Sequence, residues 1–111
     1  MGFLGKLFGK KEEEKAAAAP PISVPEVAAA NAIPPEKVGL DGAFDESGLA
    51  KRVAKALDDA NISDAVGLWV AQTGSTVVLK YNPDAEGVLE DAQRVALGVA
   101  GATDVKVVPN S

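Results

Sequence analysis

The sequence predicts an α+β fold in which two amphipathic helices cover one face of a three-stranded sheet. Three observations predict this class. Apolar residues recur with helical spacing over residues 46–60 and again over 83–100. Apolar residues also alternate along the chain on both sides of Gly74, and the valine-rich segment DVKVV follows the second helical region. The expected order of elements is αββαβ, arranged as a two-layer sandwich.

The first helix is expected over residues 46–60, where Asp45 or Ser47 can cap its N-terminus. Its apolar stripe recurs every four residues and consists of Leu49, Val53 and Leu57. The charged residues of this helix lie mostly off the stripe: Lys51, Arg52, Lys55, Asp58 and Asp59. The stripe should therefore face the sheet, and the charges should face water.

A β-hairpin is expected over residues 66–81, because two runs of alternating apolar residues flank a short loop that contains Gly74. Successive side chains of a strand point to opposite faces of the sheet, so the helices can cover only one of the two sets. The uncovered face should carry Trp69, Val78, Lys80 and Lys106, or the alternate set if the register is inverted.

The second helix is expected to begin after Asn82, which can serve as the N-cap before Pro83 at the first helical position. Gly101 should end this region in the left-handed conformation. Its apolar stripe consists of Val88, Ala92, Val95 and Val99, widened by Leu89 and Ala96. The last strand should run parallel to the second strand, either beside it or on the other side of the first.

Three zones differ in composition: an amphipathic N-terminal peptide over residues 1–15, an Ala/Pro-rich linker over 16–40 and the folded domain over 41–111. The linker holds five of the chain's seven prolines, which exclude a long helix or a central strand there. A stretch near residues 26–32 could form one or two helical turns. We therefore expect a semi-extended spacer between the peptide and the domain.

Composition excludes several functions. The chain has no cysteine and no histidine, so thiol chemistry, disulfides and His-based catalysis are absent, and no enzyme is expected. The net charge of −5 argues against nucleic-acid binding. The sequence contains no run of about 18 apolar residues, the length that a membrane-spanning helix needs, and no secretory signal is evident. We expect a cytoplasmic protein, with a peripheral position at the inner membrane as a further option.

The segments LAKRVAKALDDANISDAVGLWVAQTGSTVVLKYNP and EDAQRVALGVAGATDVKVV resemble the BON domain over residues 46–109. Lys80 stands where BON hairpins usually place a glycine, and Gly101-Ala102 stands in place of their Gly-Val. The resemblance implies a non-catalytic module of the kind found in stress-response, envelope-associated and potassium-binding proteins. It implies binding to lipid, cell envelope, a cation or a protein.

The N-terminal peptide MGFLGKLFGKK has the pattern of an interfacial helix. On a helix its apolar residues share one face, and its lysines surround that face; the set is Phe3, Leu4, Lys6, Leu7, Phe8, Lys10 and Lys11. Three interpretations are open: association with an anionic membrane surface, docking into a groove of a partner protein, or packing on its own domain. A peptide this short binds lipid weakly, so homo-oligomerisation would matter.

Two further sites are candidates. Trp69 and Tyr81 could mark a binding surface on the sheet, with core packing as the alternative. Backbone carbonyls after the second helix could bind K⁺, with an ordinary glycine cap as the alternative; they belong to Ala100, Gly101, Ala102 and Thr103. No side-chain metal site is expected.

The sequence therefore predicts a non-catalytic adaptor that its N-terminal peptide brings to a membrane surface or into a larger assembly. One alternative is a cytosolic protein that responds to potassium or another cation. Another is a structural component of a multiprotein particle, docked through residues 1–11.

Overall fold

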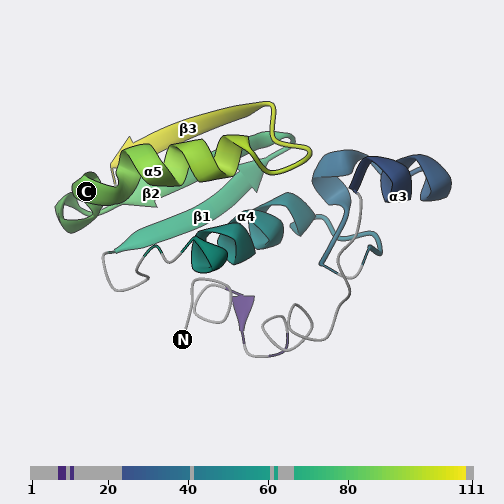
Figure 1. The fold of residues 1–111 in the computed structure, drawn as a ribbon, viewed down its shortest axis with the longest axis horizontal. Helices are drawn as coiled ribbons and strands as arrows, with labels where there is room; N and C mark the ends of the chain where they lie inside the picture. Colours follow the sequence, from purple (N-terminus) through teal and green to yellow (C-terminus); the bar gives the residue numbers. More distant parts are fainter. Residues whose placement is uncertain are drawn as a thin grey trace.

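The computed structural model describes residues 8–9, 11, 24–40, 42–60, 62 and 67–109, and it has the predicted α+β architecture (Figure 1). The elements are α3 (Val24–Asn31), η1 (Pro35–Lys37), α4 (Gly48–Asp59), β1 (Leu68–Thr73), β2 (Thr76–Tyr81), η3 (Pro83–Ala85), α5 (Glu86–Leu97) and β3 (Asp104–Pro109). The strand order is β1-β2-β3, with β1 antiparallel and β3 parallel to β2. The predicted parallel pairing is confirmed, and β3 lies beside β2.

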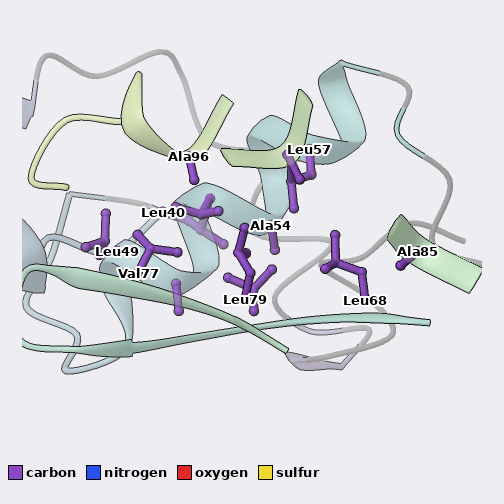
Figure 2. Packing of buried hydrophobic residues seen from close by; sticks show 13 residues of the cluster. Leu40, Leu49, Ala54, Leu57, Leu68, Val77, Leu79, Ala85 and Ala96 are labelled. Atoms are coloured by element: carbon purple, nitrogen blue, oxygen red, sulfur yellow. The ribbon is translucent and has the colours of Figure 1, made fainter. Parts of the chain in front are cut away.

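Both long helices pack on the same face of the sheet. The helix α4 contacts β1, the helix α5 contacts β2 and β3, and the two helices contact each other (Figure 1). Figure 2 shows the aliphatic side chains that fill the space between the layers. The strand residues of this core are Leu68, Val70, Val77 and Leu79. The core is built from leucine, valine and alanine, as the low aromatic content predicts.

The start of α4 differs slightly from the prediction. The helix begins at Gly48, and Ser47 occupies the N-cap position without a hydrogen bond from its hydroxyl group. The capping role belongs to Asp45, whose Oδ1 accepts a hydrogen bond from the Ser47 backbone N–H at 2.9 Å. The carboxylate thus satisfies a donor just before the first turn, where the helix dipole favours negative charge.

The packed unit begins before residue 41, within the stretch that the sequence assigned to the linker. Val38 is completely buried and Leu40 is 6% exposed, and Leu40 belongs to the main core. The predicted helical turns in this stretch are confirmed as α3, which packs Val24 and Ala28 against Val38 in a second, small cluster. Residues 35–40 therefore belong to the folded domain.

Two glycines have the backbone conformation that their turns require. Gly74, between β1 and β2, has a φ of +59°, and Gly101, after α5, has a φ of +95°. Gly101 also lies against η1, because a Cβ placed on it would be 2.9 Å from the carbonyl oxygen of Pro35. The turn after α5 thus packs closely on the segment that precedes α4.

Candidate functional site

The N-terminal peptide lies mostly outside the described residues. The structure describes Phe8, Gly9 and Lys11, so the placements of Phe3, Leu4, Lys6, Leu7 and Lys10 stay predictions. Phe8 is half-buried and packs against the main hydrophobic core, while Lys11 is exposed. The Nζ atom of Lys51 lies 5.9 Å from the centroid of the Phe8 ring, within the range of a cation–π interaction.

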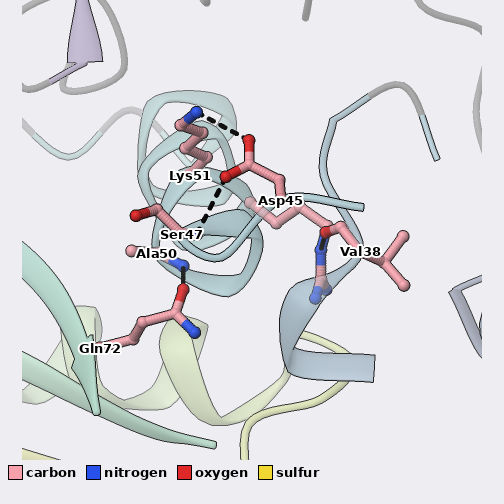
Figure 3. A network of polar contacts seen from close by, with 7 residues as sticks. Val38, Asp45, Ser47, Ala50, Lys51 and Gln72 are labelled. Carbon is pink, nitrogen blue, oxygen red and sulfur yellow. Dashed lines mark hydrogen bonds and ion pairs between the residues drawn. The ribbon is translucent and has the colours of Figure 1, made fainter. Parts of the chain in front are cut away.

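The residues around Lys51 form a polar network at the start of α4 (Figure 3). Lys51 Nζ lies 2.7 Å from Oδ2 of Asp45, and the two side chains are 16% and 21% exposed. The other carboxylate oxygen of Asp45 accepts the hydrogen bond from Ser47. This ion pair is therefore shielded from water and fixed in place by the helix start.

The open face of the sheet carries the four residues that were predicted for it. Trp69 pairs with Lys80 across β1 and β2, and Val78 pairs with Lys106 across β2 and β3. The adjacent residues along the same strands, Leu68, Val77 and Leu79, are fully buried under the helices. The alternation of the strands thus places Trp69, Val78, Lys80 and Lys106 together on the face of the sheet opposite α4 and α5, which we call the open face.

Lys80 and Lys106 are exposed, and neither forms an ion pair with any residue in the described part of the chain. Lys106 also lines a shallow hollow of about 590 Å³, together with Thr73, Thr76, Val78, Asp104 and Val108. The carboxylate of Asp104 instead accepts a hydrogen bond from the backbone N–H of Val105. This face combines apolar surface with two available ammonium groups.

Trp69 and Tyr81 do not form one binding surface. Tyr81 pairs with the buried Leu68 and packs against the main core, so it lies on the helix-covered face. Trp69 is half-buried and lies on the opposite, open face. Core packing, the alternative interpretation, therefore describes Tyr81, and only Trp69 is left as an aromatic residue of the open face.

Arg52 is the one buried charged residue among those described, at 9% exposure. Its guanidinium donates to three backbone carbonyls in two separate segments: Val38 at 2.8 Å and Pro35 before α4, and Ala100 after α5. Burial lowers the pKa of Arg52 from its ordinary value, because desolvation disfavours the charged form. The residue nevertheless stays charged near neutral pH, since arginine keeps its proton in proteins.

This geometry bears on the predicted potassium site after α5. The carbonyl oxygen of Ala100 accepts a hydrogen bond from the Arg52 guanidinium, so a cationic group of the chain itself already occupies that position. The Thr103 backbone N–H donates to the carbonyl of Ser75 at 2.9 Å, which ties the same turn to the β-hairpin. Gly101 acts as the left-handed turn residue.

Sequence reasoning missed two residues that connect the domain. Arg52 was placed off the apolar stripe, and Gln72 was not singled out. Oε1 of Gln72 accepts from the Ala50 backbone N–H at 2.8 Å (Figure 3). Its Nε2 donates to the carbonyls of Glu36 and Gly74, each at 3.0 Å. The signal for Gln72 was available, because it is a polar residue in register with Leu68 and Val70 on the covered face.

Across the described ranges, no three or more acidic residues gather in a group that could hold a metal ion. Within the same ranges, none of the helices combines the length and the apolar character needed to cross a membrane. Compared with known proteins, the chain matches no family model, no curated protein and no solved structure.

Proposed function

We propose that this chain is a non-catalytic, BON-like binding module that its N-terminal peptide tethers to an anionic membrane surface or to a larger assembly. The observation that carries the proposal is the distribution of the phenylalanines. The folded core consists of leucine, valine and alanine, whereas two of the three phenylalanines, Phe3 and Phe8, lie in the first eight residues. Phe8 is not among the fully buried residues of the core, so it can serve for attachment together with Phe3, although it would have to leave its contact with the core to do so.

The charge of the peptide favours an anionic surface as its target. Lys6, Lys10 and Lys11 accompany the apolar residues, in a chain whose net charge is −5. Each basic residue contributes about 1 kcal/mol next to an anionic lipid surface. A single peptide of this length binds weakly, so stable attachment requires several copies of the chain or a multivalent assembly. The position we propose is the cytoplasmic side of the inner membrane.

The domain itself supplies the second surface of an adaptor. Its open sheet face presents Trp69 and Val78 together with Lys80 and Lys106, whose charges have no described partner. Two other positively charged side chains of the domain are engaged within the fold: Arg52 donates to backbone carbonyls, and Lys51 forms an ion pair with Asp45. The open face is therefore the surface that we propose the tether brings to its target.

The geometry favours this function over a potassium-responsive one. A cation site on the turn after α5 would need the carbonyl of Ala100, and that oxygen already accepts from the Arg52 guanidinium. Displacing an arginine that also holds Pro35 and Val38 would break three contacts of the fold.

Vesicle flotation tests the proposal. The full chain should float with anionic vesicles, salt should release it, and neutral vesicles should bind much less of it. The variant Leu7→Glu places a charge on the apolar face of the peptide and should abolish flotation. The matched control is Leu97→Glu, because Leu97 is a leucine on the domain that is already 54% exposed.

Two results would contradict the membrane target. One is a full chain that stays in the soluble fraction with anionic vesicles, and the other is equal flotation of the Leu7→Glu and Leu97→Glu variants. In the first case, a biotinylated peptide of residues 1–11 would be used to test attachment to a protein assembly.

A further inference from the structure

The geometry points to a docking surface for the N-terminal peptide on its own domain, at the start of α4, where Phe8 lies beneath Lys51. We propose that the peptide is either docked there or bound to its target, so that docking lowers the apparent affinity of the tether. This inference rests on the proposed function, because it assigns a regulation to the same peptide.

The contact with Phe8 has two parts. The ring packs against the main core and is half-buried, which removes apolar surface from water. The ammonium of Lys51 lies 5.9 Å from the ring centroid, where the negative face of the ring attracts a cation. The packing and the electrostatic attraction thus hold the same ring against the domain.

The ammonium of Lys51 is held by a partner on the domain itself as well as by the ring of Phe8. Asp45 fixes the ammonium of Lys51 at 2.7 Å, and the backbone N–H of Ser47 fixes the carboxylate in turn. Little side-chain freedom of Lys51 is left to lose when Phe8 docks. Asp45 also neutralises Lys51, so a peptide that carries Lys10 and Lys11 is not repelled at this position.

Docking and attachment exclude each other because they use the same side chain. Phe8 belongs to the apolar face that the proposed function assigns to membrane or partner binding, and a ring packed on the core cannot also enter a bilayer. When only a fraction of the molecules has a free peptide, the apparent dissociation constant rises by the inverse of that fraction. Weakening the dock should therefore strengthen attachment.

The first measurement detects the dock in the free protein, without lipid. In the NMR spectrum of the full chain, nuclear Overhauser effects should connect the Phe8 ring to the side chain of Lys51. The ring current should also shift the Lys51 methylene resonances upfield, and Phe8→Leu should remove that shift. The methylene resonances of Lys55 serve as the internal control, since Lys55 pairs with Asp59 on the same helix. Absence of the Phe8–Lys51 effects would overturn the inference.

The second measurement asks whether the dock competes with attachment. Lys51→Gln keeps the aliphatic stem and removes the cation, whereas the matched control Lys55→Gln removes a cation one turn later. Lys51→Gln should raise the apparent affinity for anionic vesicles about two- to fivefold, the factor that corresponds to an ordinary cation–π interaction. Lys55→Gln should leave it unchanged or slightly lower it.

The sign of this effect decides the outcome. Removing a positive charge by itself weakens binding to an anionic surface, so a gain in affinity reports release of the peptide. If the NMR contact is present but Lys51→Gln binds no better than Lys55→Gln, the competition is overturned while the proposed function stands. If the contact is present and no variant binds vesicles, the membrane target fails and the competition for it fails with it.

Discussion

The helices α4 and α5 have the same length and cover the same face of the sheet, yet they are buried to very different extents. Seven residues of α4 are buried, including the charged Arg52, whereas α5 buries only Ala92 and Ala96. The larger apolar residues of α5 are partly exposed: Val88, Leu89, Val95 and Leu97. The two amphipathic patterns look alike in the sequence but serve different roles.

The difference follows from what surrounds each helix. The helix α4 is contacted by β1, by α5 and by η1, so almost every side of it except the Lys55–Asp59 side meets protein. The helix α5 meets the sheet and α4, and its alanines let it approach them closely. We conclude that α4 is the central helix of the core and that α5 covers the sheet from the outside. Matched substitutions on the two helices test this conclusion.

The largest contrast is expected between Arg52→Met and Arg94→Met. The first change leaves the carbonyls of Pro35, Val38 and Ala100 without their donor and should lower the free energy of unfolding by about 4 kcal/mol. The Arg94 side chain is 70% exposed and makes only surface ion pairs, so its loss should cost at most about 0.5 kcal/mol. Urea denaturation followed by circular dichroism measures both values.

The contrast between these two variants should not vary with pH over the physiological range. Burial lowers the pKa of Arg52 below its ordinary value, so only between the lowered and the ordinary pKa does the unfolded chain bind more protons than the folded chain. In that strongly alkaline window the stability contribution rises with pH, and below it both states are protonated. A difference between the variants that changes between about pH 5 and 9 would contradict the assignment of Arg52 as a permanent cation.

The next contrast compares leucines. Leu57 of α4 is completely buried, and its replacement by alanine should lower the free energy of unfolding by about 3 kcal/mol, from lost burial and the cavity left behind. Leu97 of α5 is 54% exposed, and Leu97→Ala should change stability by less than about 0.5 kcal/mol. Similar losses for the two variants would show that α5 is as much a part of the core as α4.

Sequence patterns predicted the elements because each pattern is local. The four-residue recurrence around Leu49 places α4, the alternation around Gly74 places the hairpin, and the parallel direction of β3 follows from the intervening helix. The open face was predicted for the same reason, since the period of a strand sorts Trp69 and Lys80 from their buried neighbours.

What could not be predicted depends on contacts between distant segments. Arg52 looks like a surface charge in a helical pattern, and only the folded chain brings the carbonyls of Pro35 and Ala100 to it. The inclusion of Val38 and Leu40 in the packed unit follows from the same contacts, although prolines make their segment resemble a linker. The contacts of Phe8 could not be predicted either, because an amphipathic pattern shows which residues share a face but not which part of the molecule that face contacts.

A contrast of opposite sign is expected for glycines in the two helices. A methyl group on Gly48 would overlap the carbonyl oxygen of Val38, so Gly48→Ala should push α4 away from that segment and destabilise the fold by about 2 kcal/mol. Gly87 of α5 has no atom within 4 Å of an added Cβ. Gly87→Ala should therefore stabilise the protein by about 0.5 kcal/mol, through helix propensity. Thermal melts of the two variants should shift in opposite directions, and a fall for both would contradict the open surroundings of Gly87.

The contrast should nearly vanish on the solvent-facing sides, where both helices carry exposed ion pairs four residues apart. Lys55 of α4 lies 2.8 Å from Asp59, and Arg94 of α5 lies 3.7 Å from Glu90. Lys55→Gln and Glu90→Gln should each cost about 0.2–0.5 kcal/mol, and both costs should fall towards zero near 1 M salt. The α5 pair should retain a slight advantage, because its acidic residue precedes the basic one and each charge faces the favourable end of the helix dipole. A cost above about 1 kcal/mol for either variant would mean that another part of the chain covers this ion pair. The conclusion that both helices expose these charged sides to solvent would then be wrong for that helix.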